Sequence, residues 1–172
     1  MRRHLLGATL LGALLPACSP ALDWREVRPE GSTAVALFPC KPKSQSRQAT
    51  LSGAQVRMTL LSCEAAGATF ALAHADLADP ARVAPALAEM AAALAANLQA
   101  TEQRSAPAAV PGMTPGPGAR RLEIAGRFPD GTPVQEEAAL FAHGTRVYQA
   151  AVLGARPGPA AQVFLDSLRV QP

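Results

Sequence analysis

The sequence predicts an α+β domain in which two helices cover an antiparallel sheet, in the order β-β-β-α-β-β-β-α. Six short segments alternate or cluster apolar residues and are joined by connections typical of hairpins, as expected for antiparallel strands. Two other segments repeat apolar residues at helical spacing, and such helices need a sheet face to bury their stripe. With 172 residues, of which 49% are hydrophobic, the chain is long enough for one such domain.

Residues 1–17 carry the three parts of a secretory signal. Arg2 and Arg3 are followed by an apolar run from Leu5 to Leu15 and then by the small residue Ala17. A short buried helix is the alternative, but the glycines and the proline of this segment are unfavourable inside a helix. We therefore expect these residues to be removed on export.

The end of this segment, Leu15-Pro16-Ala17-Cys18, resembles the lipobox of bacterial lipoproteins, although Pro16 stands where Ala, Ser or Thr is usual. The resemblance implies that Cys18 becomes the first residue of the mature chain and carries diacylglycerol on sulfur and an acyl group on nitrogen. Several acyl chains anchor a protein stably in a membrane. Ser19 replaces the aspartate of lipoproteins retained in the inner membrane, so the resemblance implies the periplasmic face of the outer membrane.

The cysteines predict one disulfide. With Cys18 assigned to lipid, Cys40 and Cys63 remain as an even pair in an oxidising compartment, where disulfides persist. Closing this loop would stabilise the fold by roughly 3 kcal/mol. A metal or catalytic role for these thiols is the alternative, but no CxxC spacing or Cys/His cluster favours it.

The charge balance excludes nucleic acid as a default partner. Without residues 1–17, 14 basic residues face 13 acidic ones. Lys41, Lys43 and Arg47 are gathered in a segment, 41–47, that is predicted as a polar loop. They could face acidic lipid or polysaccharide, but three charges in a loop are more often simply solvated.

The amino-terminal part of the mature chain predicts a tether and a strand. Residues 18–31 are rich in polar residues and proline and are expected to tether a single domain over 32–172. Their one aromatic residue, Trp24, either docks on that domain or begins its first strand. Thr33–Phe38 is a short apolar run ended by Pro39, as expected of a strand.

A hairpin and a helix follow. Gln55–Cys63 and Thr69–Asp76 are predicted strands joined by a turn at Ala65-Ala66-Gly67. Asp79-Pro80 predicts the start of a helix, because Asp caps free N–H groups and Pro fits the first turn. The helix is expected to end near Gln99 and to bury one stripe, made of Val83, Leu87, Met90, Leu94 and Leu98.

The carboxyl-terminal half predicts a loop, a meander and a last helix. Ser105–Gly118 contains four prolines and three glycines and is expected to be an exposed loop. The predicted strands are Arg120–Phe128, Val134–Ala142 and Thr145–Leu153. The predicted helix is Ala160–Leu168, which is expected to bury Val163, Phe164 and Leu168.

His74 and Asp76 are the best candidates for chemistry. Two residues apart on a strand, they share a face and could share a metal ion or a proton. The simpler interpretation is the polar end of a strand leaving the core, since two ligands are too few for a structural zinc site. Glu136 and Glu137 are adjacent, point to opposite faces and make no carboxylate pair. With no nucleophile elbow, phosphate loop or dinucleotide pattern in the sequence, we predict no catalytic residue and no cofactor.

Two motifs resemble the PsbP-like fold. Thr33–Pro39 (TAVALFP) is similar to an apolar strand ending in Phe-Pro, and Ala161–Arg169 (AQVFLDSLR) to a last helix ending in Phe/Leu-x-Ser-Phe/Leu. Over roughly residues 30–170 the chain thus resembles small lipoproteins of this α/β/α family, which includes the photosystem II extrinsic protein PsbP and bacterial DcrB-like lipoproteins. The resemblance implies an accessory or binding protein without a shared catalytic residue. The Cys40 and Cys63 pair is not a general family feature.

Three hypotheses follow for function. The first is a non-catalytic binding or assembly accessory module, held at the membrane by lipid on Cys18 and acting with an envelope protein. The second is an envelope enzyme or metal-handling protein that uses His74 and Asp76. The third is a structural envelope component whose Pro/Gly loop, 105–118, docks on a larger machine.

Overall fold

The computed structural model describes residues 22–171, so Cys18 and the predicted signal lie outside the described part of the chain. Residues 22–171 form ten strands and two α-helices, which confirms the α+β class and a mostly antiparallel sheet. The strands are β1 (Arg25–Val27), β2 (Ala34–Phe38), β3 (Lys43–Leu51), β4 (Ala54–Ala65), β5 (Ala68–Asp76), β6 (Glu102–Pro107), β7 (Arg120–Arg127), β8 (Pro133–His143), β9 (Arg146–Gly154) and β10 (Arg169–Val170). The helices are α1 (Val83–Asn97), preceded by a 3-10 turn over Pro80–Arg82, and α2 (Pro159–Asp166).

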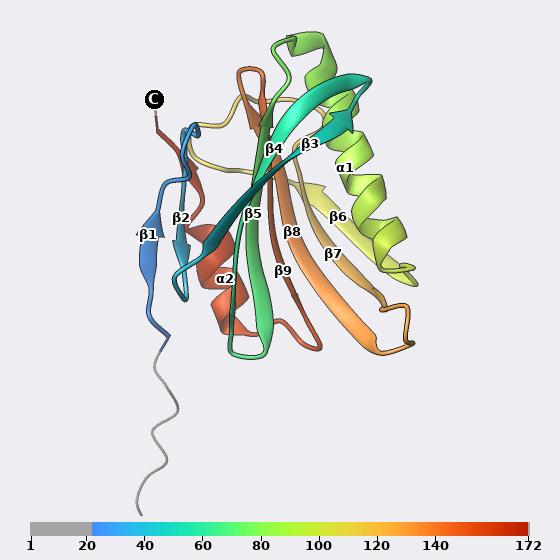
Figure 1. Ribbon diagram of the computed structural model, residues 1–172. Helices are drawn as coiled ribbons and strands as arrows, with labels where there is room; N and C mark the ends of the chain where they lie inside the picture. The colour runs from blue at the N-terminus through green and yellow to red at the C-terminus, as the bar shows by residue number, and fades with distance from the viewer. Residues whose placement is uncertain (1–21, 172) are drawn as a thin grey trace, which may run out of the picture.

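The strands form two antiparallel sheets (Figure 1). The large sheet has the order β3-β4-β5-β9-β8-β7-β6, in which the central β5–β9 pair joins the two halves of the chain. The small sheet has the order β1-β2-β10 and brings the last strand of the chain beside β2. The predicted order lacks four of these strands, namely β1, β3, β6 and β10.

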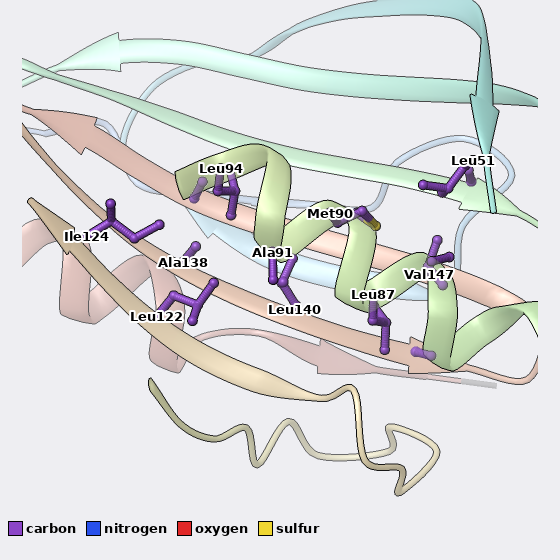
Figure 2. Close-up of a cluster of buried hydrophobic side chains, with 14 of the residues drawn as sticks. Leu51, Leu87, Met90, Ala91, Leu94, Leu122, Ile124, Ala138, Leu140 and Val147 are labelled. Carbon is purple, nitrogen blue, oxygen red and sulfur yellow. The ribbon is translucent and has the colours of Figure 1, made fainter. Parts of the chain in front are cut away.

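Each face of the large sheet buries a core of its own. Helix α1 covers one face, where aliphatic side chains of the helix point toward β7, β8 and β9 (Figure 2). Helix α2 and the small sheet cover the other, whose core contains Phe38, Phe70, Phe141, Tyr148 and Phe164. We call these the α1 face and the α2 face. Strands β8 and β9 bury residues on both faces, which explains their nearly continuous apolar sequence.

The predicted stripe of α1 is confirmed. Leu87, Met90, Leu94 and Leu98 are buried, and Val83 packs at the margin of the same core. The Asp79 carboxylate accepts a hydrogen bond from the N–H of Ala81 (2.9 Å), as expected of a cap, but the turn it caps is a 3-10 turn. The α-helix itself ends at Asn97, before the predicted end, because Gln99 turns to a positive φ of 46°.

The prediction of a loop over 41–47 is wrong. Lys43–Leu51 forms β3, which pairs with β4 along its whole length. Ser52 and Gly53 make the two-residue turn between these strands, with φ angles of 49° and 72°. The strand escapes a search for apolar alternation because it is an exposed edge with polar residues on both sides. The Ser-Gly dipeptide is the signal that indicates the hairpin.

The prediction of an exposed loop over 105–118 is correct for most of these residues, which are exposed and, from 108 on, form no strand or helix, but the segment is also held to the rest of the domain. Strand β6 extends into this segment, and Ala108 and Val110 are buried. Val170 donates its N–H to the carbonyl of Pro111 (2.8 Å), and a Cβ at Gly112 would lie 2.4 Å from the Val170 carbonyl oxygen. Proline and glycine prevent a regular element here, but hydrogen bonds to neighbouring strands satisfy part of the backbone and fix the loop at these points.

Two smaller differences concern the ends of the domain. Arg25–Val27, expected in the tether, forms β1, and Trp24 packs against the core of the α2 face. This agrees with the alternative in which the first strand begins beside Trp24. In α2, Phe164 is buried as predicted and Leu168 is buried just beyond the helix, but Val163 is 46% exposed.

Candidate functional site

His74 and Asp76 lie at the end of β5 on the α2 face, on the same side of the strand as predicted. His74 lies opposite Tyr148 of β9, and Asp76 lies opposite Arg146. Both line a pocket of about 390 Å³, which we call the His74 pocket. Its lining is mostly polar: Glu30, Gly31, Ser44, Ser46, Arg57, Thr59, His74, Asp76 and Arg146.

The Asp76 carboxylate is already engaged on both oxygens. Its Oδ1 accepts hydrogen bonds from the Thr145 hydroxyl (2.6 Å) and the Ala78 N–H (3.0 Å). Its Oδ2 accepts one from the Arg146 guanidinium (3.0 Å). The Thr145 hydrogen bond, followed by that of Ala78 and by the charge of Arg146, lowers the pKa of Asp76. The carboxylate therefore ties the end of β5 to the turn between β8 and β9.

The His74 ring is buried rather than exposed to solvent. The residue is 6% exposed, and its Nε2 has no hydrogen-bond partner among the described residues. Its ring centroid lies 6.1 Å from that of Tyr148. Burial, and secondarily the positive charge of Arg146, lower the pKa of His74, so the ring is held neutral. His74 and Asp76 thus share a face, but no hydrogen bond joins the two side chains in the described structure.

The structure groups other polar residues that the sequence pattern does not connect. The Thr33 hydroxyl lies 3.2 Å from Nδ1 of His143 and 3.1 Å from the Tyr148 hydroxyl. Thr33 lies more than 100 positions before both His143 and Tyr148 in the chain, so no local signal could have found this group. Within residues 22–171, no three His, Cys, Asp or Glu side chains are close enough together to hold a metal ion.

The predicted pairing of Cys40 with Cys63 agrees with the structure. Cys40 and Cys63 form a disulfide that joins the segment after β2 to β4. Cys63 also packs against the core of the α2 face. The bond therefore fastens the small sheet to the large one. Cys18 lies outside the described residues.

The three basic residues Lys41, Lys43 and Arg47 do not form one loop patch. Lys43 and Arg47 lie on β3 at positions of the same parity, so they share the α1 face, whereas Lys41 precedes the strand. Arg57 of β4 lies opposite Gln48 and lines the His74 pocket on the other face of the hairpin. The basic side chains are thus divided between the two faces of the hairpin.

A second hollow, of about 470 Å³, lies on the α1 face between α1 and the β3–β4 hairpin. We call it the α1 groove. Met58 and Leu60 of β4 form part of its floor, and Met90 and Leu94 line it from the helix. Leu60 is 37% exposed there, which is unusual for a large apolar residue in this chain. The alternation within the predicted strand Gln55–Cys63 places Val56, Met58 and Leu60 on one face, but it does not show that α1 leaves part of that face uncovered.

Glu136 is a buried carboxyl that the sequence analysis assigned no role. It is 6% exposed on the α1 face, opposite Ile124 of β7. Burial raises its pKa to about 7. Glu137 points the other way, as predicted, and accepts a hydrogen bond from the Gln162 amide of α2 (2.9 Å). The apolar residues at Val134 and Ala138 are the signal that position 136 faces inward.

No protein-family model and no curated protein sequence matches this chain. Within residues 22–171, no helix has both the length and the apolar character needed to cross a membrane.

Proposed function

We propose that this protein is a non-catalytic binding or assembly accessory module, tethered through lipid on Cys18 to the periplasmic face of the outer membrane. The Leu15-Pro16-Ala17-Cys18 motif supports the tether, and the Cys40–Cys63 disulfide is in keeping with an oxidising compartment. A helix on each face of an antiparallel sheet supports a PsbP-like domain. An envelope protein is the partner we expect for such a module.

The α1 groove is the observation that carries the binding role. Its volume lies within the range of about 300–1,000 Å³ that is common for small-molecule sites. Its floor exposes Leu60 and part of Met58 to solvent. Apolar side chains left uncovered beside a polar rim are typical of surfaces that bind another molecule.

The geometry favours the enzyme or metal-handling alternative less. That hypothesis needs His74 and Asp76 to act together, but the oxygens of Asp76 are engaged by Thr145, Ala78 and Arg146. Metal analysis of protein purified without a His tag tests this alternative directly. A stoichiometric ion that is lost on His74→Ala would reinstate it. The docking-loop hypothesis loses support because the 105–118 segment packs against Val170 and Ala142.

Intact mass of the protein from its native membrane fraction tests the proposal. We expect a chain that begins at Cys18 and carries lipid, and a gain of two hydrogens when Cys40 and Cys63 are reduced. An unlipidated mass with free thiols would contradict both the tether and the compartment.

A further inference from the structure

Polar contacts between the β3–β4 hairpin and α1 fix one end of the α1 groove. At the tip of the β3–β4 hairpin, Ser52 donates its N–H to the Glu89 carboxylate of α1 (2.7 Å). The Ser52 carbonyl accepts a hydrogen bond from the Arg82 guanidinium (2.6 Å). We call these two bonds the Ser52 clamp. They hold the hairpin tip against the first half of α1 and its preceding turn, and they mark one end of the groove.

The lining of the groove changes from apolar to polar along its length. Beside the clamp, the groove is lined by Leu51 and Ala49 of β3, by Met58 of β4 and by Met90 of α1. Amides lie toward the other end: Gln45 on β3, Asn97 at the end of α1, and Gln149 on β9. From Leu51 to Gln45 the strand spans about 20 Å, at roughly 3.3 Å per residue.

Arg47 is the charged residue of the groove lining that is available to a ligand. It faces the groove between the apolar end and the amides, opposite Met58. Within residues 22–171 it forms no ion pair, whereas the other charged group of the lining, Glu89, is held by Ser52. The groove therefore offers an apolar channel with one available positive charge part of the way along it.

From this arrangement we infer that the α1 groove binds a single-chain amphiphile with a carboxylate head, of the fatty-acid class. The acyl chain lies over Met58 and Met90 toward the Ser52 clamp. The carboxylate pairs with Arg47, and the amides of Gln45 and Gln149 are the nearest further donors. Methionine side chains adapt easily to the shape of a flexible chain.

A second copy of this chain fits the same surface less well. Pairing two copies edge to edge through β3, with the strand centres aligned, would set Arg47 against the Arg47 of the other copy. Like charges directly opposite each other in an antiparallel pair are destabilising. A ligand that brings a negative charge to Arg47 removes this conflict.

Calorimetric titration of the purified full chain with dodecanoate, below its critical micelle concentration, tests the inference. We expect one saturable site. Arg47→Gln should weaken dodecanoate binding about tenfold or more, because hydrogen bonds to charged groups contribute more than neutral ones. Dodecanol lacks the charge, so it should bind equally to the native chain and to this variant. Met58→Gln changes a partly exposed side chain beneath the acyl chain, so it should weaken the binding of both compounds.

Arg57→Gln is the matched control. It removes the same charge from the adjacent strand of the same hairpin, but on the face of the His74 pocket. We expect it to leave dodecanoate affinity unchanged. Absence of a saturable site, or equal losses in Arg47→Gln and Arg57→Gln, would overturn the inference. Dodecanoate binding that is insensitive to Arg47→Gln, or to Met58→Gln, would overturn it too. All the substituted side chains are at least partly exposed, so thermal unfolding can verify that each variant folds.

The inference deepens the proposed binding role and rests on it, but the two fail separately. The lipid on Cys18 is read from the intact mass, which does not depend on dodecanoate. A lipidated chain that does not bind dodecanoate would leave the tether standing and remove only this ligand.

Discussion

The two faces of the large sheet are covered in different ways. On the α2 face, the ring of Phe164 packs edge-on against Phe38 and Phe70, with centroids 4.9 and 5.6 Å apart, and Phe141 stacks on Tyr148 at 4.9 Å. A helix, a three-stranded sheet and a disulfide together close this side. The α1 face is aliphatic and carries one helix.

The difference follows from the size of the elements. Strands lie about 4.8 Å apart, and a helix with its side chains is about 10 Å wide, so one helix covers only two or three strands. Helix α1 sits over β8 and β9, which leaves the β3–β4 side of a seven-stranded sheet to form the groove. We infer that the α2 face supplies most of the stability and that the α1 face supplies the capacity to bind.

The largest expected effect is at the centre of the α2 face. Phe164→Ala should lower the free energy of unfolding by about 3–5 kcal/mol, because it removes a fully buried ring that contacts two others. Urea denaturation measures the loss. Val163→Ala, one residue away but largely exposed, should change stability by less than about 0.5 kcal/mol. Similar losses in the two variants would contradict the central place of the Phe164 ring in the core of the α2 face.

The disulfide should contribute next. The double variant Cys40→Ala/Cys63→Ala should lose about 3 kcal/mol, as expected for a closed loop of this length. The comparison is made by urea denaturation of the oxidised native protein and the double variant. Added reductant should destabilise the native protein and leave the double variant unchanged. Equal midpoints for the oxidised protein and the variant would show that the small sheet holds without the bond.

A pH-dependent effect is expected on the α1 face. The pKa of Glu136 is about 7 when folded, against about 4.3 for a carboxyl in the unfolded chain. The folded state binds this proton more tightly, so the contribution of Glu136 to stability falls as the pH rises from about 4.3 to about 7. The loss is complete only above pH 7, where it is on the order of 3–4 kcal/mol.

Glu136→Gln should remove this loss, since the side chain no longer ionises. Urea denaturation at pH 8 should show a gain in stability, and at pH 4 almost none. Glu102→Gln, which changes the charge by the same amount at an exposed position of β6, serves as control. A variant that follows the pH profile of the native protein would show that Glu136 is not a buried acid.

The smallest expected effect is at the Ser52 clamp. Glu89→Ala removes the acceptor of the Ser52 N–H at an exposed site, so the loss of global stability should be about 1 kcal/mol or less. Hydrogen exchange should show the change more clearly, as faster exchange of the Ser52 amide while the amides of β5 and β9 keep their protection. Unchanged exchange at Ser52 would mean that the hairpin tip is held by packing alone.

Local patterns account for the parts of the fold that were predicted correctly. The stripe from Leu87 to Leu98 follows from helical spacing, and the turn at Ala66 and Gly67 from its residue types, with φ angles of 49° and 73°. The common face of His74 and Asp76 follows from the period of a strand. Strand β3 was missed because an exposed edge strand requires no apolar alternation.

The sequence by itself determined the α+β class, the α1 stripe and the pairing of Cys40 with Cys63. These depend on spacing within a few residues, or on the count of one residue type. Only the tertiary structure decided that Arg146 engages Asp76, that the 105–118 loop is tied to Val170 and Ala142, and that α1 leaves a groove beside Leu60. These features depend on which distant segments meet, and the period of a strand carries no information about its neighbour or about how much of each face a helix covers.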